Sequence, residues 1–437
     1  MVKKRTMPKS ILGFLTALLL ICGTSPACRG YSILTHEEIV DLLWAGEIKP
    51  LLMAKYPQAS EEDLRKAHAY AYGGCLIQDM GYYPFGNKVF SDMVHYVRSG
   101  DFVQALLDES TDINEYAFAL GALAHYVSDT VGHPVVNASV AREFPKLRAK
   151  YGPSVTYAED HKAHIRTEFG FDVVQVAKQR YTSDSYHDFI GFEVAKPVLQ
   201  RAFLKTYGIK LEDIFTNLDL SIGSFRWAVS RAIPEMTKVA LLTKKDELVR
   251  ENPSFQKKKF LYNLKRSDYE REWGKNYHKP GFGAKLLAVI FKIIPKIGPF
   301  RNIDFKMPYP DTETLYLKSV NDTVDRYKAC LRVLDSKDNL ALVNRDFDTG
   351  KLTRSGEYSL ADETYGKLLD KLADTKFVGI SPDLRKDILT YYQDPNAPNT
   401  TKKKRDRWNK TMAELEQLKA TQVAAIPLDS SLLWLCF

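Results

Sequence analysis

Three residues with metal-binding side chains stand four positions apart in one stretch of the chain: His125, Asp129 and His133. Because an α-helix turns once in about 3.6 residues, such a series lies along one face of a helix. Imidazole nitrogens and carboxylate oxygens are ligands that zinc and related divalent cations take from proteins. The spacing therefore predicts half of a metal site on one helix. The competing interpretation is a ladder of buried polar side chains between packed helices.

A second series with the same spacing follows at His164 and Glu168, and Asp172 lies one turn further along. One such pair is expected by chance in a chain of this composition, so the pair alone carries little weight. Together with the first series, it offers the nitrogen and oxygen ligands that His133 would need to complete a second metal site.

Ligand-type residues also precede the first series. Asp79 and His95 offer a further carboxylate and imidazole, and His36 stands at the expected start of a helix. Each has an ordinary alternative: Asp79 as a helix cap or turn residue, His95 as a hydrogen-bonded core histidine, and Thr35 as an N-cap. The chain has only nine histidines and five of them fall in these series, so metal or acid–base chemistry is concentrated here.

The segments that must position these residues have a helical pattern. Apolar residues recur at helical spacing from residue 31 to about residue 242, and turn-forming residues at 81–86 and 151–154 separate the stretches. No run of alternating β-branched residues is long enough to build a sheet. The pattern predicts an all-α fold, a multi-helix bundle, with two or three further helices between residues 311 and 421.

The segment 345–350 contains two closely spaced carboxylates, Asp346 and Asp348. Such a pair could bind calcium, but the segment lacks the final glutamate of an EF-hand loop. We expect an ordinary turn there. The helical region 311–437 as a whole has no role that its sequence indicates.

The amino terminus has the pattern of an export signal. A basic leader is followed by a short apolar run at 11–22 and small residues at 25–27. The run is well short of the ~20 residues that span a bilayer. The pattern predicts a signal peptide, residues 1–30, cleaved after Ala27 or Gly30, and an exported protein in the periplasm or outside the cell. The leader holds five of the 62 basic residues and no acidic ones, so 57 basic residues remain against 54 acidic ones.

A basic connector is predicted at 246–310. Residues 257–306 contain thirteen basic and four acidic residues, interleaved with aromatic ones. The apolar stretch at 284–297 is broken by lysines and a proline, which suits a helix lying on a membrane surface. The alternative is a linker and a core helix whose lysines reach to water.

The eight ligand-type residues, in this order, resemble the zinc-dependent phospholipase C family, which shares its all-helical fold with the single-strand nucleases. The resemblance covers residues 31–245, which would form the catalytic domain. It implies a first zinc site, a second site and a third one that shares a bridging aspartate with the first. The sets it implies are Asp79, His95, His125 and Asp129; His133, His164 and Glu168; and Asp129, His36 and the chain's own amino terminus.

Two departures from that pattern bear on the prediction. The aspartate and the next histidine, Asp129 and His133, are four residues apart instead of six, a spacing more similar to the glycosylphosphatidylinositol-specific phospholipase D branch. The amino-terminal ligand would be Tyr31, which requires cleavage after Gly30. Cleavage after Ala27 would leave the third zinc poorly held, so two or three zinc ions are expected.

The resemblance implies that a zinc-bound hydroxide attacks a phosphodiester, with Asp79 as both ligand and proton acceptor. A phospholipid is the expected substrate, and a phospholipid or membrane surface the expected partner, with C-type or D-type cleavage left open. Nucleic acid is not an expected partner, because most of the charge excess belongs to the leader. Two alternatives remain: a zinc-dependent single-strand nuclease, and a non-catalytic helical binding protein stabilised by zinc.

Overall fold

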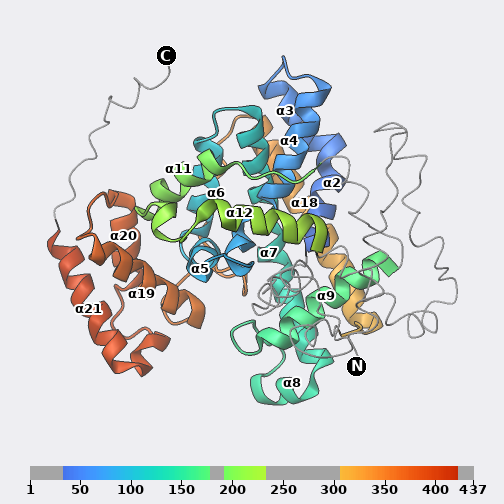
Figure 1. The fold of residues 1–437 in the computed structure, drawn as a ribbon. Helices are drawn as coiled ribbons and strands as arrows, with labels where there is room; N and C mark the ends of the chain where they lie inside the picture. Colours follow the sequence, from blue (N-terminus) through green and yellow to red (C-terminus); the bar gives the residue numbers. More distant parts are fainter. Residues whose placement is uncertain (1–32, 178–190, 233–305, 422–437) are drawn as a thin grey trace, which may run out of the picture.

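The computed structural model describes residues 33–177, 191–232 and 306–421 (Figure 1). Every regular element in these ranges is helical, and the one strand-like contact is an isolated bridge between Arg345 and Leu352. The predicted all-α fold is confirmed. No helix in this part of the chain is long and apolar enough to cross a membrane. The predicted signal peptide, Tyr31, and the connector up to residue 305 lie outside the described residues.

The bundle is built around one long helix, α7 (Ile113–Glu143), which carries the first metal-ligand series. Helices α4 (Glu61–Gly74) and α18 (Pro310–Asp335) pack against it along much of its length. Helix α4 approaches α7 backbone to backbone, because a Cβ atom on Gly121 would lie 2.1 Å from the carbonyl oxygen of Ala71. Glycine at this position therefore sets the distance between the two helices.

Side-chain caps define where several of these helices begin. Asp112 accepts the backbone N–H groups of residues 114 and 115 at the start of α7. Ser60 and Asp63 form a reciprocal capping box at the start of α4. Asn87 caps α5 (Lys88–Tyr96) by accepting the N–H of Val89. These contacts satisfy N–H groups that have no partner within the helix.

Shorter helices surround α7 and α4. Before α7 come α2 (Ile33–Leu43), the π-helical turn η1 (Trp44–Ile48), α3 (Lys49–Lys55), the 3-10 turn η2 (Ile77–Tyr82) and α6 (Ser99–Asp108). After α7 come α8 (Pro145–Tyr151), α9 (His161–Ala177), α11 (Lys196–Tyr207), η3 (Leu211–Asp213), α12 (Leu218–Trp227) and η4 (Ala228–Ala232).

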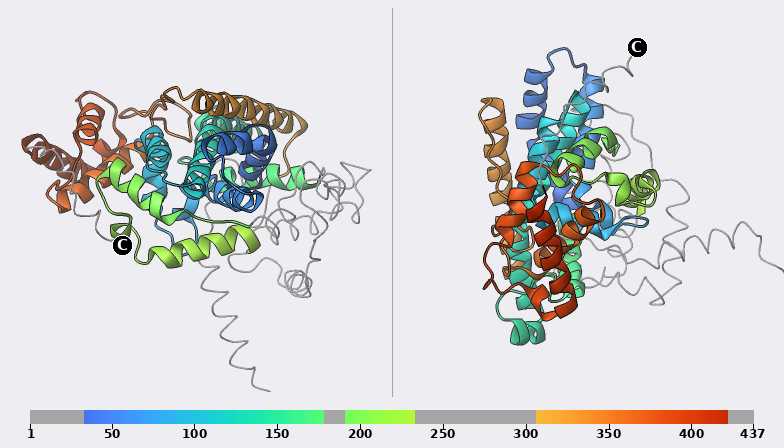
Figure 2. Two further views of the ribbon diagram at one scale, coloured as in Figure 1. Left: turned by 90° about the horizontal axis from the view of Figure 1, so that it is seen from above. Right: turned by 90° about the vertical axis from the view of Figure 1, so that its left-hand side faces the viewer.

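Residues 306–421, the described part of the C-terminal region, contain four α-helices, where two or three were predicted. After α18 these are α19 (Ser359–Asp374), α20 (Pro382–Tyr391) and α21 (Arg405–Ala420), with the 3-10 turn η6 (Thr400–Lys403) before the last. Helices α19, α20 and α21 gather at one end of the molecule, whereas α18 runs along the bundle (Figures 1 and 2). The Tyr327 hydroxyl on α18 donates to the carbonyl oxygen of Leu120 on α7, 2.9 Å away.

Asp172 on α9 fixes the start of α2. Its Oδ2 accepts the backbone N–H of Leu34 at 3.0 Å, and its Oδ1 accepts the Thr35 hydroxyl at 2.8 Å. The Thr35 hydroxyl also lies 2.5 Å from the hydroxyl of Tyr316 on α18. A carboxylate at a helix start satisfies its unpaired N–H groups and interacts favourably with the helix dipole. This contact joins α2, α9 and α18 directly beside His36.

Glu143, at the end of α7, is buried where α9 and α18 meet that helix. Its Oε1 accepts the Thr312 hydroxyl at 2.9 Å, and its Oε2 accepts the Thr167 hydroxyl at 3.2 Å. Burial raises the pKa of Glu143 from its ordinary value of 4.5 to about 7, although these hydrogen bonds favour the ionised form. The folded protein therefore holds a proton on Glu143 over a pH range in which the unfolded chain has lost it.

This difference predicts that the free energy of unfolding falls as the pH rises from about 4.5 to about 7. In that range the folded state binds more protons than the unfolded state. Glu143→Gln should make the fall shallower, as measured by urea unfolding at a series of pH values. Glu416→Gln, at an exposed site, serves as the control and should follow the wild type. Identical pH dependence in Glu143→Gln and the wild type would contradict the prediction.

Candidate metal centre

Four helices and one turn bring all eight predicted ligands together in the interior. Each of the eight side chains is at most 1 % exposed. They come from α2 (His36), η2 (Asp79), α5 (His95), α7 (His125, Asp129, His133) and α9 (His164, Glu168).

The ligand-type atoms form three groups, in each of which all the atoms lie within 4.8 Å of one another. The groups are Asp79, His95 and His125; His36, His125 and Asp129; and His133, His164 and Glu168. One group has the same members as an implied set, whereas the group with Asp79 lacks Asp129 and the group with His36 contains His125, which therefore stands in two groups. Groups of this composition match the nitrogen and oxygen ligands of zinc.

Asp129 lies at the middle of the cluster, and four imidazoles face its carboxylate. Its Oδ1 is 3.4 Å from Nε2 of His36. Its Oδ2 is 3.1 Å from Nε2 of His125, 3.4 Å from that of His133 and 3.5 Å from that of His95. Two ligands of one tetrahedral zinc, each bonded at about 2.0–2.1 Å, lie about 3.3 Å apart. The observed separations therefore suit ligands of shared cations.

The hydrogen bonds on the outer side of the rings determine which nitrogen faces the centre. Nδ1 of His95 lies 2.8 Å from the carbonyl oxygen of Ser91, and Nδ1 of His125 lies 2.9 Å from that of Cys75. A carbonyl oxygen can only accept, so each Nδ1 carries a proton and Nε2 is the nitrogen left to bind a metal. This is the tautomer in which an imidazole binds a metal through Nε2.

The same reasoning applies to His164, with the nitrogens exchanged. Its Nε2 lies 2.8 Å from Oδ1 of Asn137. The Asn137 side-chain amide donates to the backbone oxygen of Asp348 at 2.7 Å, so its Oδ1 is the accepting end. Nε2 of His164 therefore carries a proton, and Nδ1 faces Oε1 of Glu168, 2.6 Å away.

Several inward-facing atoms make no hydrogen bond with any part of the chain that the structure describes. They are Oδ1 of Asp79, Nε2 of His95 and of His125, and both carboxylate oxygens of Asp129. A buried polar atom without a hydrogen bond destabilises the folded state, and in most folded proteins such atoms have a partner. A divalent cation would satisfy these atoms together, so the residues fit zinc.

The charges of the cluster favour a cation. Burial alone would raise the pKa of Asp129, but the imidazoles of His125 and His133 hold it well below its ordinary range. Burial, together with the neighbouring His125, lowers the pKa of His36 to about 3, so that ring is neutral. Against the effect of burial, the carboxylates of Asp129 and Asp79 raise the pKa of His95 to about 9. The Asp129 carboxylate is ionised, and it attracts positive charge to the centre.

Asn137 and Asp348 contact the cluster, and the sequence analysis did not select either. Asn137 continues the four-residue series on α7 after His133, so the spacing itself could have indicated it. Asp348 lies in the segment that was expected to be an ordinary turn. The turn forms, with the N–H of Gly350 donating to the backbone oxygen of Asp346, but Oδ1 of Asp348 lies 3.5 Å from Nδ1 of His133.

Other candidates from the sequence lie elsewhere. Asp172 holds the start of α2 and takes no part in the three groups. His68 bonds to Asp41 at 2.9 Å and stacks on Trp44 in the core, and His161 is exposed. These two histidines have ordinary structural surroundings.

Comparison with known proteins agrees with this geometry. Residues 35–217 match the family model of the zinc dependent phospholipases C. All eight candidate ligands lie within the matched residues, whereas α18 to α21 and the loop with Asp348 lie beyond them. Comparison with curated proteins and with solved structures gave no match. The match supports the zinc-dependent phospholipase C family and zinc as the metal. The resemblance to the phospholipase D branch stays a prediction.

His125 stands in two of the three groups, so its loss should disturb both. We expect His125→Ala, purified without added chelator, to hold at least one zinc ion per chain fewer than the wild type. Inductively coupled plasma mass spectrometry on protein of known concentration measures this. His161→Ala changes an exposed histidine outside the groups and should keep the wild-type zinc content. Equal zinc in both variants and the wild type would exclude His125 as a ligand.

Proposed function

We propose that the protein is an exported zinc-dependent phosphodiesterase that hydrolyses phospholipids. The observation that carries the proposal is the arrangement around Asp129, where Nε2 atoms of four histidines face one buried carboxylate. The match to the zinc dependent phospholipases C supports the reaction class. The pattern of residues 1–30 supports export.

Zinc at such a site lowers the pKa of bound water to near 7 and neutralises charge on a phosphoryl group. The chain's own residues hold and orient the ions. Asp129 lies between the groups and can contact more than one ion, and Asp79 contributes a carboxylate oxygen 3.4 Å from Nε2 of His95. In this proposal Oδ1 of Asp79 also accepts a proton during hydrolysis.

Two of the three groups support at least two zinc ions in this proposal. The groups around His95 and around His164 each combine two imidazoles and a carboxylate. The third group, around His36, shares His125 with the first and would need the amino-terminal ligand Tyr31. We propose two ions as the minimum, with a third if cleavage after Gly30 makes Tyr31 the first residue of the mature chain.

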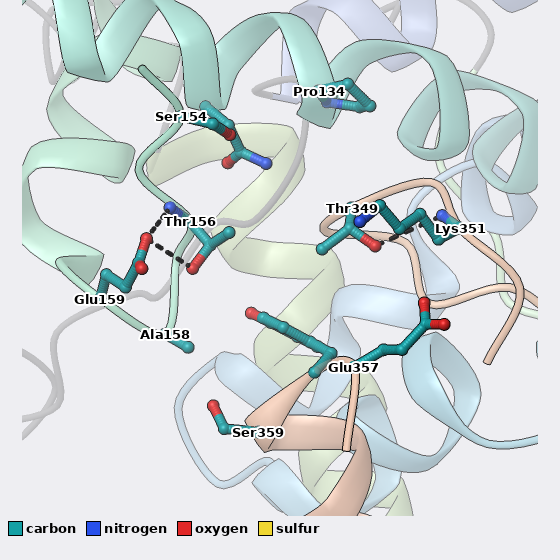
Figure 3. A pocket seen from close by; sticks show the side chains of 11 residues that line it. Pro134, Ser154, Thr156, Ala158, Glu159, Thr349, Lys351, Glu357 and Ser359 are labelled. Atoms are coloured by element: carbon teal, nitrogen blue, oxygen red, sulfur yellow. Dashed lines mark hydrogen bonds between the residues drawn. The ribbon is translucent and has the colours of Figure 1, made fainter. Parts of the chain in front are cut away.

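A polar pocket beside the second group suits the polar part of a phospholipid. The pocket, a cavity of about 410 Å³, lies between α7, the segment 154–159 and the segment 349–359 (Figure 3). Glu159, Lys351 and Glu357 line it together with hydroxyl-bearing side chains, and Asn137 forms part of its wall. Groups of both charge signs can bind a zwitterionic or hydroxyl-rich head group. They are less suited to a nucleic acid backbone, which needs mainly positive charge.

The substrate is tested by comparing vesicles of phosphatidylcholine and of phosphatidylinositol with single-stranded DNA under the same conditions. We expect hydrolysis of at least one lipid, its loss on zinc removal and its return when zinc is restored. Asp129→Asn should lower the rate by about 100-fold or more, because it weakens the carboxylate that the groups share.

The controls and the products complete this comparison. His161→Ala, outside the cluster, should retain wild-type activity. Diacylglycerol as product would indicate C-type cleavage, and phosphatidic acid D-type cleavage. Hydrolysis of DNA without any hydrolysis of lipid would contradict the proposed substrate. Lipid hydrolysis that survives both zinc removal and Asp129→Asn would contradict the proposed site.

A further inference from the structure

The loop between α18 and α19 covers one side of the metal centre, although it lies more than 120 residues beyond the match to the family model. The Phe347 ring lies 5.1 Å from the His95 ring and 5.9 Å from the His125 ring, measured between centroids. The N–H of Phe347 donates to the backbone oxygen of His95 at 3.2 Å. These contacts hold the loop against α5 and α7, two helices that carry candidate ligands.

Gly350 lets the loop approach α7 closely. Its φ of 68° lies in the left-handed region, and a Cβ atom at this position would lie 2.5 Å from the backbone oxygen of Thr130. No other residue type fits both conditions without a shift of the backbone. The loop is therefore held one turn from His133.

The two nitrogens of His133 face different carboxylates. Nε2 lies 3.4 Å from Oδ2 of Asp129, toward the centre, and Nδ1 lies 3.5 Å from Oδ1 of Asp348, on the loop side. A histidine that binds a metal through one nitrogen commonly donates the proton of the other nitrogen to a carboxylate, carbonyl or amide oxygen. His95, His125 and His164 have such an acceptor, as described above. For His133 the carboxylate that faces this nitrogen is that of Asp348, at a longer distance than the acceptors of the other three rings.

Hydrogen bonds to the other two oxygen atoms of Asp348 fix the position of this residue. Its Oδ2 accepts the hydroxyl of Tyr96 on α5 at 2.9 Å and also that of Tyr358. Its backbone oxygen accepts the side-chain amide of Asn137, which in turn orients His164. One loop residue thus contacts His133 through its carboxylate and His164 through Asn137. These are the two imidazoles of the second group.

We infer that Asp348 is a positioning residue for the second metal site, orienting His133 directly and His164 through Asn137. The inference rests on the proposed zinc function. It makes the region after residue 306 part of the metal centre, because removing the loop would take away the carboxylate beside His133 and the backbone oxygen that orients Asn137.

The test measures zinc retention and metal geometry in the full-length protein and not hydrolysis. Asp348→Ala and Asp348→Asn are loaded with zinc and then equilibrated with a chelator of known affinity. In Asp348→Ala one zinc ion per chain should be held about 10–100-fold less tightly than in the wild type. Asp348→Asn keeps an oxygen that can accept from His133 but carries no charge, so its loss should be smaller. Replacing zinc by Co²⁺ should give both variants a visible absorption spectrum different from that of the wild type.

The matched control is Asp346→Asn, which changes a buried carboxylate two residues away in the same loop. Asp346 accepts the backbone N–H of Thr349 within its own turn. Asp346→Asn is therefore expected to leave zinc retention and the Co²⁺ spectrum unchanged. Wild-type zinc retention and spectrum in Asp348→Ala would overturn the inference while the proposed function stands. Equal loss in the Asp346 and Asp348 variants would also overturn it, because the loop would then act only through its folding. A wild type that binds no zinc would overturn the inference and the proposed function together.

Discussion

The structure depends on one buried carboxylate, Asp129, and on the imidazoles of four histidines from three helices that face it. An unpaired buried charge is among the costliest features a fold can contain, and breaking such a pairing typically costs several kcal/mol. Helices α2, α5 and α7 can pack in this way only if their polar atoms find partners at their common centre. A cation provides those partners, so folding of this part of the chain and metal binding are expected to be coupled.

The outer contacts of the imidazoles show how the rest of the fold serves this centre. The acceptors come from separate places: Cys75 directly after α4, Ser91 within α5, Asn137 on α7 and Asp348 on a distant loop. For His125 and His164 the acceptor lies outside the helix that carries the ring, so the nitrogen that faces inward is a consequence of tertiary packing. Close approach of α4 at Gly121, and of the loop at Gly350, is what brings two of these acceptors within reach.

The local part of this arrangement could be predicted from the sequence, because helical periodicity needs only neighbouring residues. The spacing of His125, Asp129 and His133 placed three ligand-type side chains on one face, and the structure has them on one face of α7. Asp172 and Asp348 could not be assigned in this way. The carboxylate of Asp172 reaches Leu34, 138 residues earlier, and that of Asp348 reaches His133 from a loop with ordinary turn composition. Such contacts follow from how the helices pack, which periodicity does not determine. The domain limits predicted from composition stay a prediction, although α18 packs along α7 and α2.

The central claim is that the groups around His95 and around His164 hold separate zinc ions. Anomalous diffraction from crystals of the mature protein, recorded on both sides of the zinc absorption edge, tests it directly. The account predicts one anomalous peak among Asp79, His95 and His125 and a second among His133, His164 and Glu168, each within about 2.0–2.2 Å of the facing nitrogen and oxygen atoms. Absence of peaks at both positions in zinc-loaded crystals, with these side chains hydrogen-bonded to one another instead, would contradict it.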